Sequence, residues 1–343
     1  MRKALLGIAV LVFFIPLSMS AVTVDWVSGQ VTYRHLQSAW RDLEVGTDLM
    51  PGDMVQTGLG GEATLLENGG KIFIQENSRF TVSEKYEREE KRSAFMLFLG
   101  RLRFKLGKGG GREPEIQTQT VNLTIRGTEF EVGSGYDGST IVLLREGSVA
   151  VRGKKQDLVL EEGEGTEVPF GEEPAEKFQL ITRVIDWGQW FTQTQDAVKG
   201  NEELLLGRVL DRFTEIQDRI EEYERLREEA LAEKEQLIQE RDRLLARGEN
   251  EEASRVSREA GGKSKLAFHS RVNVRFLALS SIGLYDMAQR IYSGIPDPSK
   301  GVEEVYREIR GVYTWIEERY ILEGDRERLE KQAEKKRGCS SLF

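Results

Sequence analysis

The spacing of hydrophobic residues divides the chain into two parts with different secondary structure. Between residues 21 and 171, short segments separated by glycines alternate apolar with polar residues, as in residues 121–125. A period of two is typical of half-buried strands, so this part is predicted to be an all-β domain. Beyond a linker and a short docking helix over residues 172–200, the period lengthens toward 3.6 and predicts helices over residues 201–337. The expected fold class is α+β with segregated domains.

The first long helix is predicted to change character along its length. One row of apolar residues at seven-residue spacing runs through it, but the companion row is apolar only at its start and then continues as Arg227, Lys234 and Arg241. A two-row seam packs firmly against a partner helix, whereas a one-row seam packs weakly. The helix should therefore pack firmly in its first half and protrude, or pair weakly, in its second. The seam consists of Val209, Phe213, Ile216, Ile220 and Tyr223.

The remaining helical pattern predicts an antiparallel helical bundle or coiled-coil hairpin. Gly248 is expected to end the first helix, and residues 249–263 are expected to form the turn of the hairpin. Residues 265–291 are apolar enough to form the most buried helix, and Asp297 before Pro298 should cap the last one. Three antiparallel helices are the economical arrangement. A densely apolar segment should form the short docking helix: Ile181, Val184, Ile185, Trp187, Trp190 and Phe191.

A short motif recurs three times in the β region, with a glycine at its centre. Gly29, Gly100 and Gly147 are each followed by apolar residues two and four positions later and then by Arg or Lys. Those apolar residues share one face of a strand, and the glycine permits a bulge or a close approach at the strand entrance. The motif is therefore interpreted as a repeated structural corner. Hairpin turns are predicted at Asn68-Gly69 and Asp137-Gly138.

Several short elements of the β region, taken in chain order, resemble a FecR domain over nearly all of residues 25–168. The Gly-Asp and Thr-Gly pairs of residues 49–58, the Arg-Gly-Thr-x-Phe element of residues 126–130 and the glycine of residues 146–149 carry the resemblance. Phe130 is interpreted as a core residue, with Arg126 and Thr128 as an alternative recognition edge for a partner strand. The candidate recognition or structural residues are Gly52, Asp53, Thr57, Gly58, Arg126, Gly127, Thr128, Phe130 and Gly147.

The resemblance implies an all-β periplasmic domain. In its best-known members, such a domain receives a signal from an outer-membrane TonB-dependent receptor and passes it through a membrane helix to a cytoplasmic sigma factor. Here only Arg2 and Lys3 precede the first apolar run. Only the periplasmic module is therefore expected to carry over to this chain.

The N-terminus has the pattern of a secretory signal peptide. Arg2 and Lys3 precede an apolar run over residues 4–17, and small residues follow at the positions that a signal peptidase inspects. Cleavage is predicted after Ser20, which makes residues 1–20 the signal peptide. The alternative is an uncleaved membrane anchor with the same orientation. Either interpretation exports the remainder, and the predicted location is the periplasm.

Composition removes most other function classes. The chain has 343 residues, two histidines, one cysteine and a formal net charge of -9. These counts argue against His/Cys zinc sites, disulfide frameworks, Cys/His nucleophiles and nucleic-acid partners. No enzyme activity, metal or cofactor is predicted. Cys339, in the tail of residues 338–343, is expected to be a free thiol, with an intermolecular disulfide as the alternative.

The leading hypothesis is a non-enzymatic envelope protein that recognises or scaffolds other proteins. Its β domain and its helical hairpin would each contact an envelope partner, with self-association through the helices as a further option. The first alternative is a component of a cell-surface signalling pathway of the receptor-to-sigma-factor type. The second is a module that binds peptidoglycan or another glycan.

Overall fold

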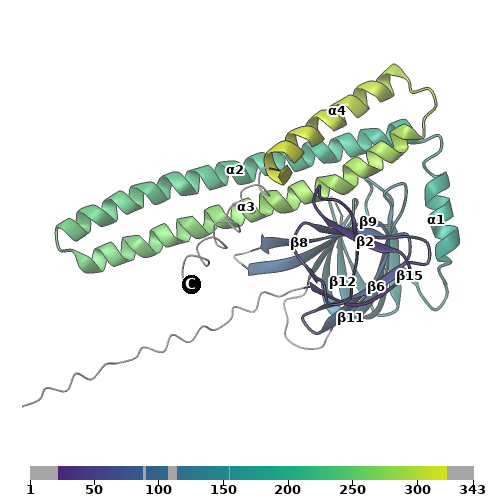
Figure 1. Cartoon of the computed structure of the whole chain (residues 1–343), viewed down its shortest axis with the longest axis horizontal. Helices are drawn as coiled ribbons and strands as arrows, with labels where there is room; N and C mark the ends of the chain where they lie inside the picture. The colour runs from purple at the N-terminus through teal and green to yellow at the C-terminus, as the bar shows by residue number, and fades with distance from the viewer. Residues whose placement is uncertain (1–21, 88–89, 107–113, 154, 323–343) are drawn as a thin grey trace, which may run out of the picture.

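A computed structural model describes residues 22–87, 90–106, 114–153 and 155–322, and the side chains of residues 126–128 are left aside. The predicted signal peptide, the predicted 338–343 tail and Cys339 lie outside these residues. The described part consists of a β domain and a group of long helices lying along one side of it (Figure 1). The predicted fold class, α+β with segregated parts, is confirmed.

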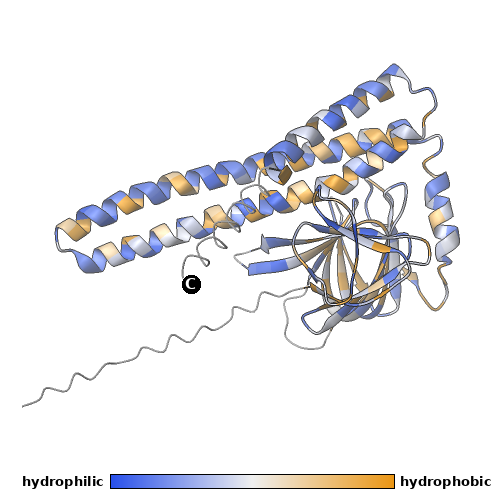
Figure 2. Cartoon of the chain, in the orientation of Figure 1, coloured by the Kyte–Doolittle hydropathy of each residue, from blue (hydrophilic) through white to orange (hydrophobic). Residues whose placement is uncertain are grey.

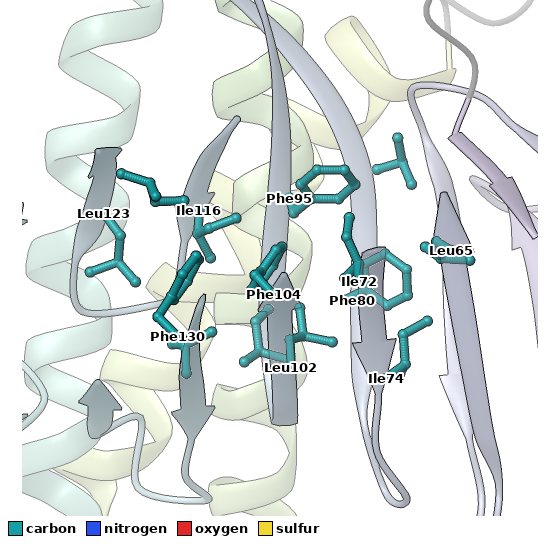
Figure 3. Close-up of a cluster of buried hydrophobic side chains, with 14 of the residues drawn as sticks. Leu65, Ile72, Ile74, Phe80, Phe95, Leu102, Phe104, Ile116, Leu123 and Phe130 are labelled. Carbon is teal, nitrogen blue, oxygen red and sulfur yellow. The ribbon is translucent and has the colours of Figure 1, made fainter. Parts of the chain in front are cut away.

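The β domain is one continuous, strongly curved sheet in the described part of the chain. Its core contains the rings of Phe95, Phe104 and Phe130, and the last two stack with centroids 4.7 Å apart (Figure 3). In several strands, such as β1, β7 and β11, apolar residues at alternate positions belong to this core, as the period of two predicts. The strands are β1 (Val22–Ser28), β2 (Val31–His35), β3 (Arg41–Asp42), β4 (Asp48–Leu49), β5 (Asp53–Thr57), β6 (Glu62–Glu67), β7 (Gly70–Ile74), β8 (Arg79–Glu87), β9 (Glu90–Lys105), β10 (Glu115–Gln117), β11 (Asn122–Ser134), β12 (Thr140–Arg152), β13 (Asp157–Glu161), β14 (Glu164–Val168) and β15 (Phe178–Gln179).

Of the three glycines in the repeated motif, Gly29 lies in the connection before β2, as predicted, whereas Gly100 and Gly147 lie inside long strands that change partners. Up to Leu99, β9 pairs with β8 along one edge, and from Leu102 onward β7 takes that place. In the same way β12 pairs with β14 before Gly147 and with β13 after it. Both glycines have positive φ angles, 96° and 99°, which residues with a Cβ adopt only under strain. They are corners inside strands, whereas the sequence pattern suggested strand entrances.

Two of the predicted hairpin turns are confirmed. Asn68 and Gly69 both have positive φ angles, 48° and 78°, and join β6 to β7 as a type I′ turn does. Gly138 has a φ of 81° in the connection between β11 and β12. Local turn chemistry therefore specified these connections without help from distant residues.

Within the described residues, four α-helices and one π-helical turn follow the strands. Figure 1 shows α2 and α3 as a long antiparallel pair, with α4 crossing them near their junction with the β domain. The predicted seam residues Val209, Phe213, Ile216 and Ile220 are buried in the helical core, and Tyr223 packs at its edge. The helices are α1 (Trp187–Asp196), α2 (Glu202–Ala246), α3 (Asn250–Ser293), α4 (Lys300–Ile316) and η1 (Glu317–Leu322).

The structure corrects two predicted helix boundaries. The turn of the hairpin spans only residues 247–249, so Gly261 and Gly262 lie inside α3 and not in a loop. The cap of α4 is Ser299, whose hydroxyl accepts the Val302 N–H, and not Asp297. In α3, favourable i,i+3 and i,i+4 charge pairs and packing against α2 outweigh the low helix propensity of Gly261 and Gly262.

The docking helix is shorter than predicted. It starts at Trp187, after Asp186 caps it by accepting the Gln189 N–H, whereas Ile181 and Val184 before it are 92% and 91% exposed. Hydrophobicity alone did not reveal the cap. An Asp side chain three residues before an amide is a better marker of a helix start than an apolar run.

Candidate interaction site at the junction and the hairpin arm

The β domain and the helices meet most closely where α3 crosses β9. Gly283 of α3 lies so close to the Phe98 ring that a Cβ at this position would be 2.1 Å from the Phe98 Cδ1 atom. Phe98 is 3% exposed. The Phe98 ring thus occupies the space that a side chain at position 283 would fill, so glycine is required for this close approach.

Apolar residues of the β domain belong to the helical core and not to the β core. Leu36, Met54, Met96 and Phe98 are buried in the same cluster as the α2 seam and the apolar face of α3. Burial of a side chain of this size contributes roughly 1.5–3 kcal/mol. Removing all the helices would therefore expose an apolar face of the β domain.

An amide side chain of α3 pairs with the free edge of β8. Asn273 Oδ1 accepts the Tyr86 N–H at 2.8 Å, and Asn273 Nδ2 donates to the Tyr86 carbonyl at 3.0 Å. These two bonds are the ones that a neighbouring strand would make, so Asn273 closes the edge at this point. The ring of Tyr86 also stacks on His269 with centroids 4.0 Å apart.

An ion pair fixes the other end of the junction. Arg79 of β8 donates to Asp286 Oδ2 of α3 at 2.5 Å and to the Gln56 side chain of β5 at 2.9 Å. Both members of the pair are largely shielded from water, so the attraction is screened less than at an open surface. Together with Asn273 and Gly283, this pair holds α3 at three points over about three and a half turns of helix.

Beyond the junction, α2 and α3 form an arm, defined here as residues 230–266. A helix of the length of α2, 45 residues, is about 68 Å long. Figure 1 shows the arm projecting away from the β domain, and Figure 2 shows hydrophilic colours over most of it. Leu244, Ala253 and Val256 form a small buried cluster near its tip. The arm therefore has a small core of its own, in addition to the single row of apolar residues at seven-residue spacing.

The outer surface of the arm carries isolated apolar side chains between charged ones. Leu231, Leu245 and Leu266 are 41%, 49% and 42% exposed. Charged side chains around them form intrahelical pairs such as Arg255–Glu252, and Lys263 pairs with Glu233 across the two helices. Single exposed leucines are common on soluble surfaces, so their distribution alone does not define a binding patch.

The Gly-Asp pair of the sequence motif lies at the junction and supports it from the β side. Asp53 is buried, its Oδ1 lies 2.6 Å from His35 Nδ1, and its Oδ2 accepts the Met50 N–H. Gly52 has a φ of 103°, and a Cβ there would be 3.2 Å from Arg275 Nη2 of α3. This pair therefore shapes the turn against which α3 packs, and a role in recognition stays a prediction.

The other motif residues organise the β domain. The Thr57 hydroxyl donates to the Gln75 carbonyl and accepts the Ser78 N–H, and the Gly58 N–H donates to the Gln30 carbonyl. Phe130 is in the β core, and Gly147 forms a strand corner. The side chains of Arg126 and Thr128 lie outside the part of the structure that is described, so a recognition role for residues 126–128 also stays a prediction.

The α1 helix attaches to the opposite end of the β domain. Trp190 donates its indole N–H to Glu167 at 2.9 Å, and the Arg101 guanidinium lies 4.7 Å from the centre of the Trp187 ring. Burial lowers the pKa of Arg101, and the nearby Glu131 carboxylate raises it in part. These contacts fix the path of the chain between the strands and α2.

Within the residues described, no cluster of three or more His, Cys, Asp or Glu side chains could hold a metal ion. Across the same residues, no helix is both long and apolar enough to cross a membrane. Sequence reasoning had not singled out Asn273, Tyr86 or Gly283. A glycine in the most apolar stretch of α3 was the one available signal, because glycine there lowers helix stability and needs a packing reason.

Comparison with known proteins identifies the β part. Residues 53–150 match the FecR family, described as FecR protein. This stretch is a FecR domain, and the resemblance seen in the sequence is confirmed.

Two crystal structures of a proposed anti-sigma factor from Parabacteroides distasonis are also similar to part of the chain. Both have a TM-score of 0.32, with 16% and 17% sequence identity, and each match covers 37% of this chain. The match spans 59% of the length of those structures. No curated protein matches the sequence.

Proposed function

We propose that this protein is a non-enzymatic recognition or scaffolding component of the cell envelope, located in the periplasm. Its FecR domain binds one envelope protein and its hairpin arm contacts a second partner. The observation that carries the proposal is the junction: α3 is at once the helix that packs on β8 and β9 and one of the two helices of the arm. A partner at the tip is thus held at a fixed position relative to the FecR domain.

The energetics of the arm favour this role. A solvated hairpin buries little apolar surface, and its single charge pairs contribute only about 0.2–0.5 kcal/mol each. Helix stability in proteins comes mostly from tertiary packing, so an arm of this length contributes little to the stability of the β domain. Its reach of tens of ångströms is useful for spanning a distance to another molecule.

The test is a shortened arm. Residues 233–246 and 250–263 are deleted, and the turn of residues 247–249 is kept. Glu233 and Lys263 pair across the hairpin, so the cut removes matching lengths of both helices. It also removes the cluster of Leu244, Ala253 and Val256 and leaves the junction residues in place. Deleting all the helices would be a poorer test because it would expose the face around Phe98.

Partners are identified by in-cell photo-cross-linking from two sites of similar exposure. Val159 in the FecR domain is 46% exposed, and Leu245 in the arm is 49% exposed. We expect the two sites to capture different envelope proteins. The shortened chain should keep the protein captured from Val159 and lose co-purification of the one captured from Leu245. If the shortened chain retains both proteins, or if Leu245 captures none, the two-partner proposal is wrong.

The FecR match supports a second candidate, a component of a receptor-to-sigma-factor signalling pathway. In that case the protein captured from Val159 would be an outer-membrane receptor or a membrane-bound regulator. Removing the chain from the cell would then change transcription of a defined gene set, and restoring the full chain would reverse the change. Unchanged transcription together with a disturbed envelope would leave scaffolding as the function.

A further inference from the structure

A cavity of about 300 Å³ lies at the junction, between the end of β2, α3, α4 and η1. Arg34 and Gln37 of the FecR domain line one side, and Tyr285, Arg310 and Glu317 of the helices line the other. A volume of this size is at the lower end of the range for small-molecule sites. A ligand there would contact both parts of the protein at once.

The cationic side of the cavity has hydrogen-bond donors available. The Nε atom of Arg34 is buried and has no hydrogen-bond partner among the described residues. A buried donor without an acceptor costs about 1–3 kcal/mol. Because this atom is closed off from solvent, a ligand in the cavity would contact Arg34 through the rest of its guanidinium group. The flat face of the Arg34 guanidinium lies 4.6 Å from the centre of the Trp40 ring, which holds the side chain in place. Arg310, exposed at the rim on α4, adds a second guanidinium.

The anionic side of the cavity carries a charge that only neutral groups contact. Glu317 Oε1 accepts the Tyr313 hydroxyl at 3.0 Å and the Gln37 amide at 2.5 Å, and in the described residues it forms no ion pair. Burial raises the pKa of the Tyr313 hydroxyl, and the negative charge of Glu317 raises it further. The hydroxyl therefore stays protonated and donates its hydrogen bond. The other carboxylate, Asp286, is already paired with Arg79. Glu317 is therefore the carboxylate that remains for a cationic ligand group.

Two stacked aromatic rings and two unusual backbone conformations complete the lining of the cavity. Tyr285 and Tyr313 stack in parallel with ring centroids 4.0 Å apart, and both side chains line one wall of the cavity. Glu317 is the first residue of the π-helical turn η1, and such turns are frequent at functional sites. On the facing side, Leu36 has a φ of 49°, which costs about 1–3 kcal/mol for a residue other than glycine.

We propose that this cavity binds a small zwitterion, either a free amino acid or a short peptide. Its carboxylate accepts hydrogen bonds from Arg34 and Arg310, because guanidinium groups match the geometry of a carboxylate. Its ammonium group pairs with Glu317, and its side chain lies against the Tyr285–Tyr313 wall. A ligand with one charge would satisfy one side of the cavity and leave the other uncompensated.

This proposal goes beyond the partner-binding function and is independent of it. The arm deletion described above leaves all the cavity residues in place, so binding of a zwitterion should be unchanged in the shortened chain. Failure of the arm to bind a partner would not affect the cavity. Conversely, an inactive cavity would not affect capture of partners from Leu245.

The experiment is calorimetric titration of the full chain with a small panel of probes. Alanine and dialanine represent the two zwitterions, and acetate and ethylamine represent each charge alone. We expect at least one zwitterion to bind at least tenfold more tightly than either singly charged probe. The tighter of alanine and dialanine identifies the source as an amino acid or a peptide. Equal affinities for all four probes, or no binding, would overturn the proposal.

Two variants assign the charges, and a third is the matched control. Glu317→Gln should weaken zwitterion binding at least tenfold and leave acetate binding unchanged, whereas Arg310→Gln should weaken both. Arg307→Gln, on the exposed surface of the same helix but outside the cavity lining, should change neither. Arg310 is exposed, so its replacement does not threaten folding. If Arg310→Gln and Glu317→Gln bind zwitterions as tightly as the Arg307→Gln control, the cavity is not the site.

Discussion

Gly283 provides the most direct test of the junction, because the smallest possible side chain should separate its two sides. In Gly283→Ala the new Cβ would lie 2.1 Å from Phe98 Cδ1 and 2.5 Å from Cγ. An ordinary contact is more than 1 Å longer. The Phe98 ring is buried and cannot turn away into solvent. Either α3 moves off β9 or the ring leaves its preferred rotamer.

The magnitude follows from comparison with a second glycine. Gly311→Ala in α4 meets no atom within 4 Å and should stabilise its helix by about 0.5–1 kcal/mol. Gly283→Ala has the same propensity gain, but overpacking a dense core costs typically about 1–3 kcal/mol. The propensity gains cancel in the difference. Gly283→Ala should therefore be less stable than Gly311→Ala by about 1–3 kcal/mol.

The measurement is urea unfolding of the two variants and the unchanged chain, followed by helical circular dichroism. Limited proteolysis near residues 98 and 283 reports whether the two sides of the junction have separated. We expect a lower midpoint for Gly283→Ala and a higher one for Gly311→Ala. Equal stabilisation by both substitutions would refute the close approach of α3 and β9.

Four further substitutions test three other parts of the structure. Asn273→Ala removes the acceptor of the Tyr86 N–H and the donor to the Tyr86 carbonyl, and it should destabilise the chain by about 1–3 kcal/mol. Hydrogen exchange at the Tyr86 amide should become faster. Unchanged exchange would show that Asn273 does not close the edge. Burial raises the pKa of Glu67 above its usual 4.5, so the folded state holds the proton more tightly and the unfolding free energy falls as pH rises from about that value through the folded pKa. Glu67→Gln should flatten this pH dependence and be more stable at pH 7 in urea titrations, and a decline identical to that of the unchanged chain would contradict it. Gly261→Ala and Gly262→Ala, with open space at each Cβ, should each stabilise the arm by about 0.5–1 kcal/mol, and no rise in its melting temperature would count against a continuous α3 there.

The order of strands and helices, the tight turns and the FecR domain could be predicted from the sequence because each depends on nearby residues. Asn68-Gly69 specifies its turn through two φ angles, and the seam of Val209 to Ile220 follows from a seven-residue repeat. Such signals survive in a sequence because the interacting groups lie within a few turns or residues of one another.

Only the tertiary structure showed what the two parts do to each other. Asn273 and Tyr86 are separated by 187 positions, and Arg79 and Asp286 by 207, so no local pattern links them. The same holds for Gly283, whose lack of a side chain has meaning only beside the Phe98 ring. The junction depends on contacts between distant segments, because its free energy comes from shape and charge matching across two surfaces. The sequence by itself determined each surface, and the packing of α3 on β8 and β9 decided that they meet.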